Sequence, residues 1–185
     1  MCKKRCSWAN SSPLEQVYHD EEWGVPKHDD LVLFELLVLE SMQAGLSWST
    51  ILAKRQTLND AYDQFNPTIV ASYDQKKIEE LLNNPGVIRH KLKIAATISN
   101  AQRYLAIQKE YGSFDNFIWS YVAHQQIDNQ WADISQVPST SDLSTTISKD
   151  LKKRGFKFLG PTTIYSFLQA AGLVNDHVVT CFKKS

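Results

Sequence analysis

The chain has 185 residues, 43% of them hydrophobic and 11% aromatic, which is enough to bury a core and excludes a disordered protein. Its 20 basic and 20 acidic residues cancel, so binding to nucleic acids or acidic membranes would need a local basic patch. The three cysteines, Cys2, Cys6 and Cys181, lie only near the chain ends, which favours a reduced cytoplasmic protein over a disulfide framework. Neither a secretory signal nor a membrane span is expected.

Helical periodicity dominates the chain and predicts an all-α protein that forms one domain over residues 1–185. The first strong helix covers the apolar stretch 30–45, with Asp30 as the expected N-cap and Gly45 as the stop. A long amphipathic helix over 88–112 is expected to close at its terminal glycine. N-terminal signals precede the other helices in this part of the chain: Ser47, Asn66 followed by Pro67, Asp74 and Ser113.

The last third of the chain begins with an irregular polar stretch, His124–Thr140, which is predicted to be a surface loop. The next segment is predicted to form a helical hairpin. Its turn and its second helix lie within residues 152–172. Gly155 is expected to end the first helix, Gly160 to adopt a positive φ in the turn, and Thr162 or its neighbour to cap the second helix.

Basic residues surround this turn and supply a local patch that the overall charge lacks. Lys149 and Lys152 add to it, and only Asp150 opposes it, while the exposed amides at the start of the second helix suit a phosphate. The alternative is an ordinary helical hairpin with solvated lysines, and a weaker candidate for the same groove lies at 85–93. We predict contacts to DNA from Lys153, Arg154, Lys157, Gly160 and Thr162.

Cysteine and histidine side chains at the two chain ends form a possible metal site. His177 and Cys181 are four residues apart, and a last short helical turn would place both on one face. Cys6 and His19 complete a set of two thiols and two imidazoles. Four protein ligands leave no open position, so the expected zinc is structural and joins the chain ends. Cys2 is a competing thiol, and the alternative is that all of these are ordinary residues.

Aromatic residues concentrate near one acidic residue. Glu40 lies on a stretch that is otherwise apolar on nearly every helical face, where a carboxylate is costly unless it meets a donor or a cation. Aromatic faces beside a buried acid describe a pocket for a flat, cationic ring. The alternative is that the tryptophans belong to the core and the acid lies at a helix edge. The aromatic residues of the predicted pocket are Trp8, Tyr18, Trp23 and Trp48.

Five segments spread over nearly the whole chain carry a recognisable pattern. They are R-C-x-W (Arg5–Trp8), Y-H-D-x-E-W-G-x-P (Tyr18–Pro26), E-x-x-Q-A-G-L-S-W (Glu40–Trp48), K-R-G-F-K-F-x-G-P-T (Lys153–Thr162) and G-L-V-N-D-H-x-x-x-C (Gly172–Cys181). In this order and at this length, the segments resemble the DNA-3-methyladenine glycosylase I family.

The resemblance implies a helix-hairpin-helix DNA glycosylase fold with one structural zinc on Cys6, His19, His177 and Cys181. It implies an enzyme of DNA base-excision repair that acts on double-stranded alkylated DNA, hydrolyses the N-glycosidic bond of 3-methyladenine and leaves an abasic site. Water is then the nucleophile, and the strand is not cut. Glu40 is expected to bond the edge of the flipped base as the important acid, with the aromatic residues stacking on its faces.

The sequence departs from the family at Glu15, which stands three residues before Tyr18 where a second tyrosine is frequent. Asp176, sixteen residues beyond Gly160, matches the position of a catalytic aspartate in the wider superfamily. Because it adjoins His177, it could instead orient that ligand or cap a helix. Competing hypotheses are a non-catalytic DNA-binding module that uses the hairpin alone, and a hydrolase acting at the zinc. A monomer is expected.

Overall fold

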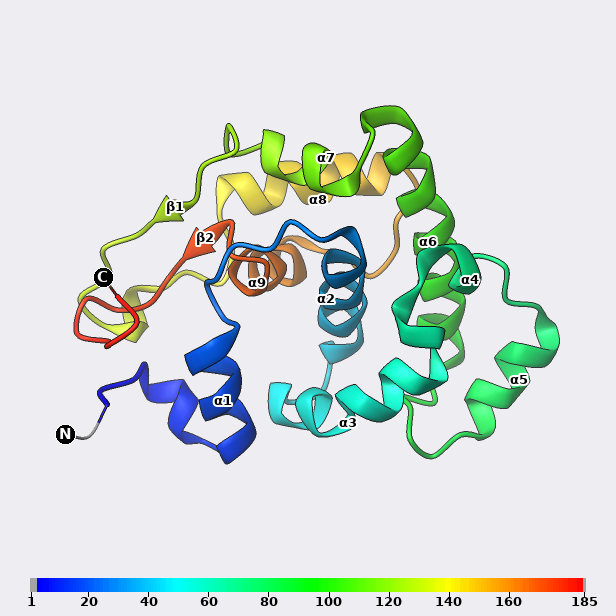
Figure 1. Cartoon of the computed structure of the whole chain (residues 1–185), viewed down its shortest axis with the longest axis horizontal. Coiled ribbons are helices and arrows are strands. Elements are labelled where there is room, and N and C mark those ends of the chain that lie inside the picture. The colour runs from blue at the N-terminus through cyan, green and yellow to red at the C-terminus, as the bar shows by residue number, and fades with distance from the viewer. Residues whose placement is uncertain (1–2, 185) are drawn as a thin grey trace.

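The computed structural model describes residues 3–184, and these residues are mostly helical, as the sequence predicts (Figure 1). The α-helices are α1 (Pro13–Glu21), α2 (Asp30–Gln43), α3 (Trp48–Ala61), α4 (Pro67–Val70), α5 (Gln75–Asn83), α6 (Lys91–Tyr111), α7 (Phe114–Ser120), α8 (Asp142–Lys153) and α9 (Pro161–Ala170). Short 3-10 helices are η1 (Ser7–Asn10), η2 (Asp63–Phe65) and η3 (Ile134–Gln136). Strands β1 (Ile127–Asp128) and β2 (Val174–Asn175) pair in parallel and are too short to show a strand period in the sequence.

The predicted N-terminal signals are confirmed for most helices: the side chains of Ser47, Asn66, Asp74 and Ser113 each accept a backbone N–H of the turn that follows. For α2 the prediction is wrong by one residue, because Asp29 is the N-cap and accepts the N–H groups of Leu31 and Val32. The carboxylate of Asp30 instead accepts the N–H groups of Phe114 and Asp115, at the start of α7. Two adjacent aspartates can both cap, and only the tertiary structure decides which helix each one serves.

The helical hairpin formed by α8 and α9 is present, but its turn differs from the prediction. Gly155 follows α8 with a φ of +92°, as expected. Gly160 has a φ of −69° and is itself the N-cap of α9, and Phe158 adopts the positive φ, at +58°. Because Pro161 begins the helix, Thr162 and its neighbour lie inside α9 and do not cap it.

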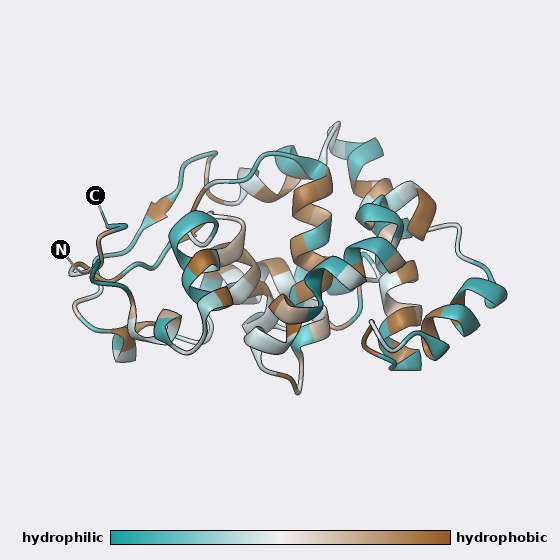
Figure 2. Cartoon of the chain, turned by 60° about the horizontal axis from the view of Figure 1, so that its bottom comes forward, coloured by the Kyte–Doolittle hydropathy of each residue, from teal (hydrophilic) through white to brown (hydrophobic). Residues whose placement is uncertain are grey.

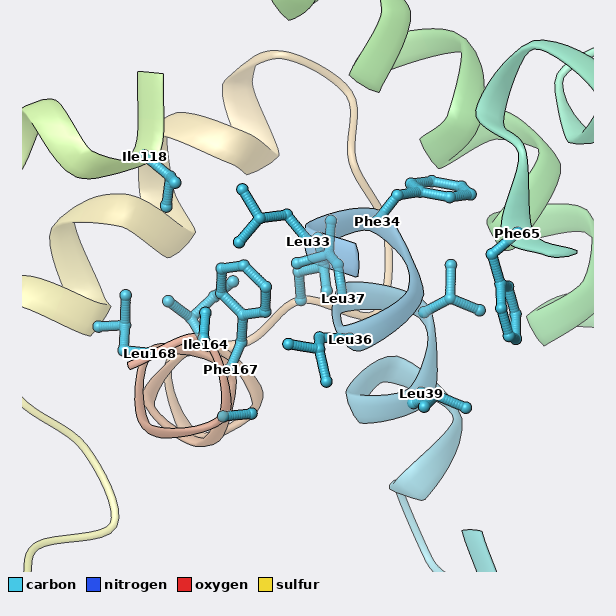
Figure 3. Close-up of a cluster of buried hydrophobic side chains, with 14 of the residues drawn as sticks. Leu33, Phe34, Leu36, Leu37, Leu39, Phe65, Ile118, Ile164, Phe167 and Leu168 are labelled. Carbon is cyan, nitrogen blue, oxygen red and sulfur yellow. The ribbon is translucent and has the colours of Figure 1, made fainter. Parts of the chain in front are cut away.

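Helix α2 lies at the centre of the molecule, between α9 and α6 (Figures 1 and 3). Leu33 and Leu37 are buried beside Phe167 of α9, and Phe34 meets the ring of Tyr104 on α6 at a centroid distance of 4.9 Å. A helix that is apolar on nearly every face belongs in the interior, whereas the outer helices carry hydrophilic residues between hydrophobic ones (Figure 2). Glu40 lies near the C-terminal end of α2, so the central position of this helix buries the Glu40 side chain inside the protein.

The two ends of the described chain lie together on one side of the molecule (Figures 1 and 2). A backbone hydrogen bond of 2.8 Å from Phe182 to Lys4 joins them. The stretch His124–Thr140 runs beside the C-terminal segment and is irregular apart from β1 and η3 (Figure 1). No helix within residues 3–184 is both long and apolar enough to cross a membrane.

Candidate active site

A cavity of about 220 Å³ opens between the N-terminal part of the chain and α9. Five of its lining residues are the ones that the sequence singles out as pocket residues: Trp8, Tyr18, Trp23, Glu40 and Trp48. The structure therefore brings together side chains from η1, α1, α2 and α3. The three tryptophans belong to the core or pack against it, and all three also line this cavity.

The aromatic walls of this cavity pack against one another at an angle. The rings of Tyr18 and Trp48 have a centroid distance of 5.3 Å, and those of Trp8 and Trp23 a distance of 5.0 Å in an edge-on arrangement. Mutual edge-to-face packing fixes each ring and leaves ring faces available to a planar ligand. Trp48 reaches the cavity as the first residue of α3, directly after its N-cap, Ser47.

An arginine on α3 holds the elements that carry the cavity walls. The guanidinium of Arg55 donates to Glu22, which follows α1, and to Glu35 on α2, each at 2.7 Å. Because these carboxylates come from two elements, one side chain fixes α1, α2 and α3 relative to one another.

The carboxyl group of Glu40 is the central feature of the cavity. Its side chain is 5% exposed, and burial raises its pKa to about 8. Its Oε2 atom has no hydrogen-bond partner among the described residues, and neither has the indole N–H of Trp48. Unpaired buried polar groups are costly, so an acceptor and a donor left open in one cavity indicate a ligand that supplies both partners.

The raised pKa predicts a pH-dependent cost of burying Glu40. The folded protein holds this proton up to about pH 8, whereas an unfolded glutamate releases it near its ordinary pKa of 4.5. The free energy of unfolding therefore falls as the pH rises between these values. Relative to the wild type, Glu40→Gln should gain up to about 4 kcal/mol at pH 8 and less than about 1 kcal/mol at pH 5. Denaturant unfolding of both proteins at the two pH values measures this difference, and an equal gain at both would contradict it.

Five further residues line the cavity and were not predicted: Gln43, Ile134, Val137, Ser166 and Gln169. One of them had a signal in the sequence, because Gln43 follows Glu40 by three residues on the same helix and so shares its face. Ser166 and Gln169 have the same spacing on α9, but none of the predicted pocket residues lies on that helix. Ile134 and Val137 come from the irregular stretch that we predicted to be a surface loop, and it had no periodicity that could reveal them.

A second cavity, of about 270 Å³, continues from the first toward the hairpin. It shares Glu40, Gln43 and Ser166 with the first cavity and then passes along the first turn of α9. Its other lining residues are Ala44, Gly45, Leu46, Thr162 and Thr163. The predicted hairpin residue Thr162 therefore lies on the path that leads to the buried acid.

The hairpin itself borders a groove of about 490 Å³ that is lined by Lys149, Lys152, Lys157 and Gly160 together with apolar side chains. The side chain of Lys153 is exposed at the end of α8, outside this groove. Among the described residues, none of these four lysines forms an ion pair. They therefore keep a net positive charge at the surface, in a protein whose total charge is zero.

The structure gives Arg154 a different environment from these lysines. Its guanidinium pairs with Glu110 at 2.8 Å and with Asp150 at 3.4 Å, and lies 5.1 Å from the ring centre of Phe117. Its charge is thus already balanced within the protein, which makes it a weaker candidate for a phosphate contact than Lys157.

The four residues predicted to bind a metal at the chain ends come together in the structure. Cys6, His19, His177 and Cys181 are all buried, and one ligand atom from each lies within 4.8 Å of the others. The expected helical turn at His177 is wrong, because this segment forms no helix after β2. The ligands still meet, since coordination requires only that the four atoms converge. Cys2 lies outside the described residues.

The protonation chemistry of these four residues suits a cation. Burial and the neighbouring Cys181 raise the pKa of the Cys6 thiol to about 12, so two thiolates need a positive ion beside them. Burial lowers the pKa of both histidines, to about 4 for His177, which favours the neutral imidazole that binds metals. Nδ1 of His19 lies 2.9 Å from the carboxylate of Asp20, which fixes the ring with Nε2 toward the sulfur of Cys181.

The cluster of Cys6, His19, His177 and Cys181 also contacts the aromatic cavity. Nε2 of His177 donates to the backbone carbonyl of Trp23 at 3.1 Å, and their rings pack edge-on at 4.7 Å. Trp8 packs against His19 at 5.4 Å in the same manner. Two of the cavity's aromatic walls therefore rest directly on the histidines of the cluster.

Two other positions singled out in the sequence lie outside the cavity. Glu15 is nearly buried, and its carboxylate accepts a hydrogen bond from Ser12 at the start of α1. No aromatic ring therefore stands at this position. Asp176 is fully buried, and its carboxylate is occupied by hydrogen bonds from other side chains.

Comparison with known proteins agrees with this geometry. The family model described as methyladenine glycosylase matches residues 8–184. The chain is 48% identical to DNA-3-methyladenine glycosylase 1 of Escherichia coli (strain K12), over 96% of this chain and 95% of that protein. It is similar to a crystal structure of 3-methyladenine DNA glycosylase I, with a TM-score of 0.95 and 47% identity over 98% of this chain and 100% of the other. A Staphylococcus aureus structure that describes the basis of 3-methyladenine recognition gives a TM-score of 0.94 and 43% identity over 98% and 96% of the chains. This chain therefore belongs to the methyladenine glycosylase family.

Proposed function

We propose that this protein is a DNA-3-methyladenine glycosylase, a hydrolase of base-excision repair. It cleaves the N-glycosidic bond of 3-methyladenine in double-stranded alkylated DNA and leaves an abasic site. The observation that carries the proposal is the carboxyl group of Glu40, buried and unpartnered in a cavity with aromatic walls. The named relatives and the bound base in one similar solved structure support the same reaction.

The chemistry follows from the charge of the damaged base. Methylation at N3 makes adenine cationic in DNA, so the base is already a good leaving group. A cationic ring in the cavity favours the carboxylate form of Glu40, whose pKa is about 8 without one. A neutral adenine gains no such charge attraction, so the cavity selects the damaged base by differential binding.

The remaining groups hold the base and leave the chemistry to water. The faces of Trp8, Tyr18, Trp23 and Trp48 bind the flipped base, and the indole N–H of Trp48 supplies a donor. Among the described residues, no lysine lines the cavity, so no amine is at hand to form a Schiff base. This supports a monofunctional enzyme in which water attacks the sugar.

DNA reaches the cavity from the hairpin side. The path along Thr162 to Glu40 and the unpaired lysines near Gly160 support a docking face for the phosphate backbone, in a helix-hairpin-helix arrangement. The non-catalytic alternative explains this face, but it gives no reason for an open acceptor and donor in the cavity.

We propose Zn²⁺ as the ion of the terminal cluster, since two thiolates and two imidazoles form a tetrahedral set. The set is complete without water, so the ion stabilises the fold and does no chemistry. A reduced thiol pair suits the cytoplasm. By tying Cys6 to Cys181, the ion would close residues 1–185 into one domain, which we expect to act as a monomer.

Mass spectrometry of bases released from methylated duplex DNA tests the proposal directly. The wild-type protein should release 3-methyladenine and leave an intact strand with an abasic site. Binding to the same DNA without release of any base would overturn the enzymatic function and leave the binding-module alternative.

The docking face gives a separate prediction. Lys153→Ala combined with Lys157→Ala should weaken DNA binding and flatten the dependence of log K on log salt by about two units of slope, because each lysine releases about one counterion. Titrations of duplex DNA at several salt concentrations measure the slope. Lys76→Ala on α5, an exposed lysine far from the hairpin, is the control and should leave it nearly unchanged. An unaltered slope in the double variant would move the DNA contact elsewhere.

A further inference from the structure

Asp176 is the most heavily hydrogen-bonded carboxylate near the cavity. It is 0% exposed, and both of its oxygens accept side-chain hydrogen bonds. The donors are Nδ2 of Asn129 and Nε1 of Trp131, each at 2.7 Å to Oδ1, and the hydroxyl of Tyr165 at 2.6 Å and Nε2 of Gln169 at 2.8 Å to Oδ2.

This arrangement leaves Asp176 no capacity to act on a substrate. A carboxylate has about four acceptor positions, and four donors already occupy them. The residue is fully buried and does not line the cavity. Its match to the position of a superfamily catalytic aspartate therefore does not carry the same role here.

Two of the four donors connect Asp176 to the cavity. The first is Gln169, which lines the cavity itself. Because a carboxylate only accepts, it holds the NH₂ side of this amide and prevents the amide from flipping. Asp176 therefore leaves the amide oxygen of Gln169 available to a ligand.

The second connection runs through Trp131 to the irregular stretch that carries Ile134 and Val137. The indole of Trp131 donates to Asp176, and its backbone carbonyl accepts the N–H of Val179 at 2.9 Å. Ile134 and Val137 follow within one short turn and line the cavity. An irregular segment keeps its position only through such anchors, since no helix or long strand holds it.

We propose that Asp176 is a positioning residue for base recognition, fixing the Gln169 amide and, through Trp131, the Ile134–Val137 wall of the cavity. This rests on the proposed function, because the wall matters only if the cavity takes a base. Asp176 acts through its neighbours and never touches the base. The role explains why a carboxylate, and not an amide, stands here. An asparagine would replace one acceptor oxygen with an NH₂ group, and that donor would face two of the four donors.

The test compares three variants that each disturb this cluster. Asp176→Asn weakens all four side-chain hydrogen bonds, Trp131→Phe removes the indole bond that anchors the wall, and Tyr165→Phe removes a donor that does not line the cavity. We expect the first two to raise the dissociation constant for free 3-methyladenine, and KM, by about tenfold with a smaller change in kcat. Tyr165→Phe should lower the melting temperature but leave the dissociation constant near that of the wild type. Metal content, measured in parallel, should remain at one equivalent in all three.

Three results would overturn the proposal. Loss of kcat at unchanged base affinity in Asp176→Asn would make it a catalytic base. A lower melting temperature with unchanged affinity in every variant would make it purely structural, and loss of metal would make it a support of His177. Hydrogen exchange without any ligand tests the positioning role separately from the proposed function. Backbone amides of 131–137 should exchange faster in Asp176→Asn and Trp131→Phe than in Tyr165→Phe, whether or not the wild type releases 3-methyladenine.

Discussion

Glu40→Gln is expected to lower kcat/KM for release of 3-methyladenine by about 100-fold or more, because it removes the negative charge that faces a cationic base. The variant keeps the size of the side chain and one hydrogen-bond acceptor, so stacking between the aromatic walls should persist. Binding of neutral purines should change little, and the preference for the damaged base should shrink with the activity. Steady-state release from methylated duplex DNA, with free-base titrations, measures both quantities.

The control for this prediction is another buried polar atom without a partner. Among the described residues, the hydroxyl of Tyr62 shares this property with Glu40 and Trp48, but it does not line the cavity. Tyr62→Phe should leave activity unchanged and be neutral or stabilising, because it removes an unsatisfied group. Equal activity of Glu40→Gln and the wild type would remove this residue from the mechanism. A loss of activity in Tyr62→Phe of the same size would show that the assay reports stability.

The contrast between Glu40 and two other cavity residues, Ile134 and Val137, shows what the sequence could reveal about the site. Glu40 stood out in the sequence because it interrupts a helix that is apolar on nearly every face, a pattern that favours a buried position over a helix edge. Ile134 and Val137 were not predictable, because they come from an irregular stretch whose position depends on distant anchors such as Asp176. A sequence pattern reports the local environment of a residue, and a cavity also depends on the segments that fold over it.

The hairpin and the chain end illustrate the same limit. The turn between α8 and α9 was predicted from Gly155 and the residues around it. Within this turn, however, Phe158 and not Gly160 adopts the positive φ. The convergence of the four proposed metal ligands was predicted from rare residue types at the two ends, although His177 does not lie on a helix. Residue chemistry was therefore a better guide than backbone geometry, because four ligands can converge from many backbone conformations.

Removal of a metal ligand is expected to cause the largest loss of stability. Cys181→Ser should lower the free energy of unfolding by more than about 3 kcal/mol and reduce the bound metal below one equivalent, because metal binding contributes directly to folding. The His177 and His19 rings that support Trp23 and Trp8 would lose their common ion, so base affinity should fall as well, even at temperatures where the variant is folded. Metal analysis, thermal unfolding and titration with 3-methyladenine measure the three effects, and a chelator should reproduce them in the wild type.

Cys2→Ser is the matched control, since it removes a thiol from the same chain end without removing one of the four converging ligands. It should keep one equivalent of metal and the wild-type melting temperature. If Cys181→Ser also kept both, the cluster would be an ordinary group of buried residues. If it lost the metal but bound the base with unchanged affinity, the ion would stabilise the chain ends alone. The contacts of His19 and His177 with the aromatic walls argue for the coupled result. The side chains that would bind the ion are the same ones that Trp8 and Trp23 contact, so loss of the ion is expected to change the shape of the cavity.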